Sequence, residues 1–431
     1  MSFIKKHLLT FIFLAGLIIR LLFIFGNYSF DVNSYIVWAK DLHERGFLGF
    51  FNKQSSEVYG VLYPNYPPLT LFIFYLFYPL PKIIFNFFWF LNTHLPVFPS
   101  NFISLLESID KRLFLAAMLK LPAILSDIGL AWIMTLFTKK IYPKRNLSLL
   151  AVSLILFNPV FIYNSSLWGQ IDSIPLFFVM VSIYFLLFSR KNILSGVFFI
   201  LGLLVKPTVL VFLPVYGLIF LKKFGFYKTT RAILVSILVF WLLFLPFLKK
   251  ISLSESLLIY WRDIVSGQRM PNVTNHAFNF WMLFTSLKKT TLDTASFISG
   301  LSYRFWGNVL TGIFLIIILF RLLRRKISIE ITLYGLFFSS LTMVLFMTKM
   351  HERFFLLPLP FLLLLSIKNK SYLKYFCLMS IVVFLNIYHS WTAPYIPFIF
   401  KFIDTPLVIK TLSLMNVLIF IRFAKIIPCK S

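Results

Sequence analysis

Acidic residues and cysteines are scarce in this 431-residue chain, and each shortage excludes a class of protein. Asp and Glu together number 14, against 42 Lys and Arg, and there are only two cysteines. Cys377 and Cys429 are too few for a disulfide framework, and their spacing does not suggest a metal site. The sequence also has no dense acidic cluster of the kind that holds a divalent cation, so no resident metal or cofactor is predicted.

The formal net charge of +28 could suit a nucleic-acid-binding protein, but the distribution of the charge argues against that class. Basic residues gather in short links between apolar runs, which is the positive-inside pattern of membrane proteins. We therefore expect a lipid bilayer, and no nucleic acid, as the partner of this charge. The links predicted to be cytoplasmic contain Lys139, Lys140, Lys144 and Arg145; Arg190 and Lys191; Lys222 and Lys223; Arg321, Arg324, Arg325 and Lys326; and Lys368 and Lys370.

Apolar runs close to the thickness of a bilayer recur along the whole chain. Hydrophobic residues make up 59% of the sequence, and the mean hydropathy is +0.88. This composition predicts an all-α polytopic membrane protein with one integral-membrane domain, residues 1–431. No small-residue cleavage site follows the first run, so we expect that run to remain as a span. About twelve transmembrane helices, with both termini cytoplasmic, are expected at 7–25, 112–137, 147–163, 173–188, 193–205, 208–221, 232–247, 305–320, 329–346, 354–367, 375–388 and 406–421.

Two long polar segments, 27–111 and 249–304, are expected on the outer face, opposite the basic links. In the first segment, Tyr35 and Trp38 repeat at helical spacing among charged residues. That pattern predicts an amphipathic juxtamembrane helix, which Gly46 ends.

Residues 69–98 are apolar but interrupted by prolines and a lysine. One complete crossing there would reverse the sidedness of the later basic links, and the segment is too short for two crossings. An interfacial hairpin is therefore preferred over a single span.

Residues 158–173 join two apolar runs through a polar patch that ends in Trp168, Gln170 and Asp172. An ionisable group inside a bilayer costs about 2.5–3.5 kcal/mol on insertion scales, so it usually faces a wet cavity or a partner. A plain polar loop between two helices is the alternative interpretation. The functional interpretation gains weight because other polar stretches are expected on the same side of the membrane.

Asp31 opens the first outer loop, and Tyr66 precedes two prolines that fix the start of the next helix. Lys206 interrupts an apolar stretch immediately before Pro207, and such broken helices are tolerated where their backbone lines a cavity. Structural alternatives exist for the first two. Asp31 could cap the following helix, and prolines at a helix start are common without function.

Two further motifs complete the expected outer-face site. The first sets several ionisable groups between two apolar spans and suits a phosphate, although a solvated turn explains it too. The second sets two amides beside an aromatic residue and fits sugar contact, although an interfacial anchor explains it too. The motifs consist of Lys349, His351, Glu352 and Arg353, and of Asn275, Asn279 and Trp281.

Lys120 and Asp127 lie seven residues apart on one side of a predicted span. Two helical turns separate them, which is too far for a direct ion pair on a straight helix. Each therefore needs another partner, and we expect a buried structural network for Asp127.

Taken together, these motifs resemble the GT-C superfamily of membrane glycosyltransferases that use polyprenyl-phosphate sugars, and above all the branch related to GPI mannosyltransferase II. The matching pieces occur in the family's order and span most of the chain. The ordered set is typical of the superfamily and does not identify the sugar. The pieces are Asp31 with YIVWAKDL, NYPPLTLF, KLPAILSDIGLAW, NPVFIYNSSLWGQIDS, GLLVKPTVLVFLP, NHAFNFW and MHERFFLLPLP.

The resemblance implies a GT-C-type bundle in the plasma (inner) membrane that moves a hexose, with mannose favoured, from a polyprenyl-phosphate carrier. The acceptor would be a hydroxyl of a glycan, glycolipid or protein on the outer face. Asp31 matches the family's catalytic aspartate and is expected to be the base of an inverting transfer. His351, Arg353 and Lys206 are expected to stabilise the leaving phosphate. A divalent cation shared by Asp31 and Asp172 is the less favoured alternative.

The rival class is a transporter or flippase of polyprenyl-linked glycans or lipids, which would also use many spans and cationic phosphate contacts. Two features argue against it. The chain shows no internal repeat of the kind that many transporter folds contain, and its polar motifs are expected on one side rather than near the midplane. A GT-C-like scaffold without catalysis is a third interpretation.

Overall fold

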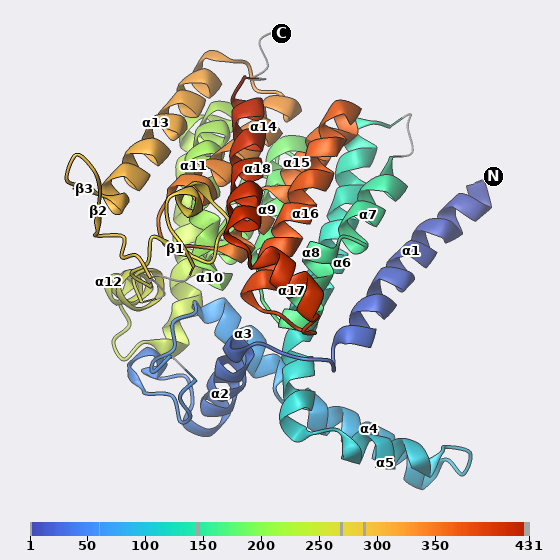
Figure 1. Cartoon of the computed structure of the whole chain (residues 1–431). Coiled ribbons are helices and arrows are strands. Elements are labelled where there is room, and N and C mark those ends of the chain that lie inside the picture. The colour runs from blue at the N-terminus through green and yellow to red at the C-terminus, as the bar shows by residue number, and fades with distance from the viewer. Residues whose placement is uncertain (1, 60, 144–146, 268–269, 288–289, 426–431) are drawn as a thin grey trace.

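The computed structural model describes residues 2–59, 61–143, 147–267, 270–287 and 290–425, and helices dominate it (Figure 1). The predicted cytoplasmic residues Lys144 and Arg145, and Cys429, lie outside the described residues. The α-helices are α1 (Ser2–Phe23), α2 (Phe30–Arg45), α3 (Pro68–Phe77), α4 (Leu80–His94), α5 (Ser100–Ser108), α6 (Lys111–Ile141), α7 (Ser148–Leu156), α8 (Pro159–Ile162), α9 (Ser173–Phe188), α10 (Asn192–Val205), α11 (Leu213–Phe244), α12 (Leu253–Ile259), α13 (Tyr303–Arg324), α14 (Ile329–Phe346), α15 (Leu359–Lys368), α16 (Leu373–Ser390), α17 (Pro397–Ile403) and α18 (Pro406–Lys425).

The links between these helices contain short strands and short helical turns. The strands are β1 (Thr274–Asn275), β2 (Ser296–Ile298), β3 (Leu301–Ser302) and β4 (Met350–His351). The 3-10 turns span Phe50–Asn52, Pro207–Phe212, Leu245–Phe247, Phe280–Leu283, Glu352–Leu356 and Lys370–Tyr372, and the π-helical turns span Tyr163–Trp168 and Tyr260–Val265.

Within the described residues, seven helical stretches are long and apolar enough to cross a membrane. The number rises to eight if α7 and the bent segment after it count as one span. The protein is therefore a helical, multi-pass membrane protein, as its composition predicts. The seven stretches are Pro68–His94, Lys111–Ile141, Pro207–Phe247, Tyr303–Arg324, Ile329–Phe346, Lys370–Ser390 and Pro406–Lys425.

The stretch Pro207–Phe247 is 41 residues long and reverses direction at Gly225. Gly225 has φ 77° and ψ 173°, a conformation that glycine adopts far more readily than other residues. Val205, just before the stretch, and Phe247, at its end, belong to one hydrophobic cluster with Trp38. The chain thus enters and leaves at the same end of the bundle, which confirms two separate apolar helices here.

The basic links meet at the other end of the bundle. Lys222 donates to the carbonyl of Leu322 at 2.7 Å, and Lys223 donates to that of Leu187 at 2.7 Å. These contacts bring together the links that follow α9, α13 and the first arm of α11. Figure 1 shows that α1 begins and α18 ends at this same end, whereas α2, α3 and α12 lie at the opposite one.

Helix α2 has the buried face that the sequence predicts. Tyr35 and Trp38 are each 1% exposed, and they pack in a hydrophobic cluster with residues of α3, α6, α10, α11 and α12. Gly46 ends the helix with φ 70°. This cluster fixes the first outer segment against the helical bundle.

Helices α4 and α5 form an antiparallel hairpin that extends away from the bundle (Figure 1). Length and hydropathy alone make Pro68–His94 a candidate span. However, Figure 1 shows α4 running across the direction of the bundle helices, so we favour the predicted interfacial hairpin. Its predicted boundaries are wrong, because α3 packs separately against α2 and α10 and the hairpin turn follows α4.

The second outer segment departs from the purely α-helical prediction. Strand β1 pairs in parallel with β4, and β2 pairs antiparallel with β3. The first pairing joins Asn275 to His351, which are far apart in the sequence. Strands of two or three residues leave no periodic pattern for sequence analysis to detect.

Asp127 lies in the buried network that the sequence predicts. Its Oδ2 accepts from Arg20 Nε at 2.8 Å, and both of its oxygens accept from serine hydroxyls, those of Ser165 and Ser173. Lys120 instead donates to backbone carbonyls, among them that of Ser166 at 3.0 Å. The two residues therefore have separate partners, as expected, and both connect α6 to neighbouring segments.

Candidate functional site

A cavity of about 470 Å³ lies beside α2 and the turn between α14 and α15. Its volume is in the range of small-molecule sites. The structure brings five of the sequence-predicted site residues into its lining, from four separate segments of the chain. These are Asp31, Tyr66, Lys206, His351 and Arg353.

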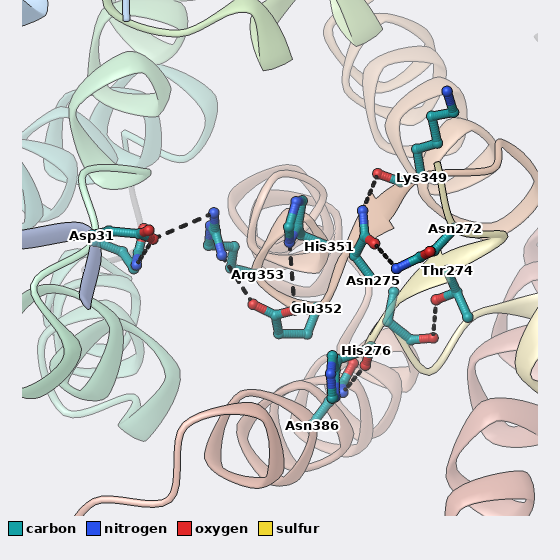
Figure 2. Close-up of polar contacts among 12 residues, drawn as sticks. Asp31, Asn272, Thr274, Asn275, His276, Lys349, His351, Glu352, Arg353 and Asn386 are labelled. Atoms are coloured by element: carbon teal, nitrogen blue, oxygen red, sulfur yellow. Dashed lines mark hydrogen bonds and ion pairs between the residues drawn. The ribbon is translucent and has the colours of Figure 1, made fainter. Parts of the chain in front are cut away.

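Asp31 lies in the first turn of α2 and points toward Arg353 (Figure 2). Its Oδ2 accepts a hydrogen bond from Gln170 Nε2 at 2.7 Å, and the side chain is 43% exposed. The alternative that Asp31 caps this helix is wrong, because Ser29 occupies the N-cap position. The carboxylate is thus oriented by a buried amide and remains accessible from the cavity.

A distorted segment holds that amide in place. The π-helical turn Tyr163–Trp168 ends at Gly169, which has φ 82°. A Cβ on Gly169 would lie 2.6 Å from Val32 Cγ2, so only glycine allows α2 to approach this closely. The N–H of Ser29 also donates to the carbonyl of Trp168 at 3.0 Å. These contacts fix the start of α2 beside Gln170.

Arg353 lies among three carboxylates. Its Nη2 is 3.8 Å from Asp31 Oδ2, and its Nε is 3.6 Å from Asp172 Oδ2. Its Nη1 donates to Glu352 Oε1 at 3.1 Å (Figure 2). Burial lowers the pKa of Arg353, but the charges of these carboxylates outweigh burial and raise the pKa overall. Arg353 is therefore a permanent cation in the cavity wall.

Arg353 is not locked by these contacts. Its Nε and Asp172 Oδ2 are both buried, and neither has a hydrogen-bond partner among the described residues. The Nε donor of Arg353 is therefore not used by any described residue. Asp172 is better held by Lys206, whose Nζ donates to Oδ1 at 2.6 Å.

His351 and Glu352 have pKa values shifted toward their neutral forms. Burial is the main cause of the lowered pKa of His351, and the charges of Arg353 and Lys206 add to it. Burial raises the pKa of Glu352, although the charge of Arg353 opposes this. His351 is thus neutral at pH 7 in the ligand-free cavity and can serve as a hydrogen-bonding group rather than as a fixed cation.

Four predicted site residues lie behind the cavity lining rather than in it. The ring of Trp168 is 5.5 Å from the Arg353 guanidinium and stacks on Trp391 at 6.2 Å. Such a cation–π contact supports the guanidinium from behind. Gln170, Asp172 and Glu352 are also buried and contact lining residues. This group positions Asp31, Lys206 and Arg353 and does not line the cavity.

The amide and aromatic motif of the second outer segment is not in the cavity lining. Asn275 donates to the carbonyl of Lys349 at 3.3 Å, and Asn279 accepts from the N–H of Trp281 at 3.1 Å. Trp281 Nε1 donates to the carbonyl of Phe346 at 2.7 Å. All three residues are buried, and they fasten the second outer segment to the end of α14 and the turn that follows it.

The cavity also contains charged residues that sequence analysis does not predict as site residues. These are Asp293 and Arg304, which line it together with Lys349 of the predicted phosphate motif. Asp293 lies before β2 and Arg304 lies eleven residues later in the first turn of α13, and no motif or periodicity marks them. Tyr35 also lines the cavity, with its hydroxyl 3.4 Å from that of Tyr66.

Within the described ranges, no group of three or more His, Cys, Asp or Glu residues is arranged to hold a metal ion. The group that lies near both Asp31 and Asp172 is the Arg353 guanidinium. No family model matches the chain, and no curated protein matches it.

Proposed function

We propose that this protein is a membrane glycosyltransferase of the GT-C type, which transfers a hexose from a polyprenyl-phosphate carrier to an acceptor hydroxyl with inversion. Mannose is the favoured sugar because of the branch that the motifs resemble. The observation that carries the proposal is the cavity itself. It combines an accessible carboxylate, Asp31, with two cations, the buried Lys206 and the largely buried Arg353.

The arrangement suits each part of the transfer. The acceptor oxygen attacks the anomeric carbon of the hexose while its proton moves to the Asp31 carboxylate. The bond from the anomeric carbon to the phosphate oxygen breaks, and the polyprenyl phosphate leaves with the electron pair. Lys206 and Arg353 stabilise the charge of the leaving phosphate, and neutral His351 supplies a hydrogen bond.

We further propose twelve crossings, with the cavity on the outer face and both termini in the cytoplasm. This count takes the two arms of the Pro207–Phe247 stretch as two crossings and the bent pair beginning with α7 as one. It excludes α2–α5, α12 and α17. The meeting of basic links at the end opposite the cavity supports this orientation under the positive-inside rule.

The test is an assay of the purified full-length protein with radiolabelled polyprenyl-phosphate hexoses and candidate glycan, glycolipid and peptide acceptors. Asp31→Asn keeps the size of the side chain but removes its ability to accept a proton. We expect retained donor binding and a loss of turnover of about 10²- to 10⁴-fold.

The matched control is Asp404→Asn. Asp404 is also 43% exposed and also ion-paired, in this case with His389, but it does not line the cavity. Normal turnover by both variants would remove Asp31 as the base. Vectorial movement of the labelled lipid without sugar transfer would instead identify a transporter.

A further inference from the structure

The cavity has a second charged end, away from Asp31, formed by Asp293, Arg304 and Lys349. Asp293 is fully buried and accepts from Arg304 through both oxygens, at 2.7 Å from Nε and 2.8 Å from Nη2. Lys349 Nζ lies 3.4 Å from Asp293 Oδ2. Two cations therefore face one carboxylate. Arg304 already makes a bidentate contact with it, so Lys349 is the second, less needed cation.

Lys349 is held in a strained backbone conformation. Lys349 has φ 65°, which is uncommon for a residue with a Cβ. Its N–H donates to the carbonyl of Val273 at 3.0 Å, and its carbonyl accepts from Asn275. Figure 2 shows its side chain pointing away from Arg353 and Asp31. Strained conformations of this kind persist where the surrounding contacts impose them, and they concentrate at ligand sites.

The two charged ends differ in their balance of charge. At the Asp31 end, Lys206 and Arg353 are shared among three carboxylates. Among the described residues of the second end, two cations face one carboxylate, and the Arg304 side chain remains 48% exposed. Apolar side chains also line the cavity, among them Leu210, Val211, Met343 and Met347. The cavity therefore offers a separate position for a second anion.

We propose that Arg304 and Lys349 bind a phosphate group of the acceptor. This inference rests on the proposed function, in which the donor phosphate lies beside Lys206 and Arg353. A second anion in the same cavity then belongs to the other substrate. Guanidinium and ammonium groups together suit a phosphate, which Arg binds through a planar fork and Lys binds as a point charge. The phosphate is that of a lipid headgroup or of a soluble glycan phosphate.

The first experiment measures phosphate binding by the full-length protein in nanodiscs, without any transfer reaction. The soluble probe is glycerol 1-phosphate, added to phosphatidylcholine nanodiscs and followed by ³¹P NMR. The lipid probe is phosphatidylglycerol, titrated into the same nanodiscs and followed by native mass spectrometry. Lys349→Gln should weaken binding about tenfold, because it removes one charge-assisted contact and leaves the Asp293–Arg304 pair. Lys349→Arg keeps the charge and should retain binding.

The matched control is Lys40→Gln. Lys40 also shares a carboxylate with an arginine, since Glu57 pairs with both Lys40 and Arg112, but these residues do not line the cavity. Its phosphate binding should equal that of the wild type. Saturable binding of glycerol 1-phosphate identifies a soluble source, and binding of phosphatidylglycerol alone identifies a lipid source. Equal binding by wild type and Lys349→Gln, or no binding of either probe, overturns the proposal.

A second measurement separates this proposal from the proposed function. Lys349→Gln should raise KM for a phosphate-bearing acceptor and leave KM for its dephosphorylated form unchanged. Equal rises for both acceptors would overturn the assignment of Lys349 to the phosphate. If the wild type transfers no sugar at all, the proposed function fails, and the binding experiment alone decides whether the second end is a phosphate site.

Discussion

At the scale of single residues, the geometry around Arg353 depends on the shape of its side chain as well as on its charge. One planar guanidinium reaches Asp31, Asp172 and Glu352 through three different nitrogens. A lysine ammonium is a single point and cannot approach all three carboxylates from this position. Arg353 therefore contacts both the proposed base, Asp31, and the carboxylates behind it.

We predict that Arg353→Lys lowers turnover about 10²-fold although it keeps the charge, because the donors facing the leaving phosphate are displaced. The measurement is kcat with labelled donor. Arg262→Lys is the control, since Arg262 also pairs with an adjacent acid, Asp263, but is 55% exposed and outside the cavity. Wild-type kcat for Arg353→Lys would show that only the charge matters.

His351 should make the stability of the protein depend on pH. Because its native pKa lies well below 6.5, the unfolded state binds a proton near pH 6.5 that the native state does not. Stability should therefore rise with pH through this region, by at most about 1.4 kcal/mol per pH unit. Thermal unfolding in detergent should show a smaller difference between pH 5.5 and 7.5 for His351→Gln than for the wild type. His94→Gln, at an exposed histidine of α4, should match the wild type.

At the scale of elements, the segment from Tyr163 to Gly169 connects a helix of the bundle to the position of Asp31, the proposed base. Its π-helical turn widens the helix, and Gly169 then redirects the chain so that Gln170 faces Asp31. Such π-helical turns are frequent at functional sites. The segment links the packing of α6 and α9 to the orientation of one carboxylate.

Gly169→Ala should therefore damage both stability and activity. We expect a loss of about 1–2 kcal/mol from the left-handed backbone and about 1–3 kcal/mol from contact with Val32. Gly49→Ala has the same left-handed backbone, with φ 66° and ψ 22°, and its added Cβ meets only the flexible side chain of Lys249, so it should show little more than the backbone penalty. Thermal melts and turnover of both variants test this. Equal melting temperatures would mean that the contact with Val32 relaxes without cost.

Two elements show which structural features can be predicted from the sequence. The helical spacing of Tyr35 and Trp38 predicts α2 and its buried face, because a 3.6-residue period records which side faces a core. For Asn275, Asn279 and Trp281 the sequence predicts contact with substrate, but in the structure they contact the backbone of α14 and its following turn. Their partners are more than 60 residues away, and such pairings leave no local pattern.

The same reasoning applies to the candidate site. Asp31, Lys206 and Arg353 stand out in sequence because each is a charged residue beside a long apolar run, where a charge is costly. Asp293 and Arg304 lie in a polar segment where charges are ordinary, so only the folded chain reveals their position in the cavity.

At the scale of the whole molecule, the proposed orientation can be tested by cysteine labelling. In a variant with Cys377 and Cys429 replaced by serine, we expect Ser254→Cys to react with an impermeant maleimide added outside cells. Ser328→Cys should react only after permeabilisation. Both positions are exposed; Ser254 lies in α12, and Ser328 directly precedes α14 at the end of the bundle opposite α12 (Figure 1). Labelling of both positions from the same side would reject the twelve-crossing topology.

The buried pair of Arg20 and Asp127 has a consequence for the order of biosynthesis. Arg20 belongs to α1, yet its carboxylate partner is 107 residues later, on α6. At about 5–20 residues per second, translation takes roughly 5–20 s to supply that partner. During this interval the arginine has no counter-charge in the bilayer, which disfavours release of α1 into lipid. We expect nascent chains that lack α6 to hold α1 beside the insertion machinery, and Arg20→Leu to let it leave early. Helix α1, although it is made first, would then be among the last helices to reach its final position in the membrane.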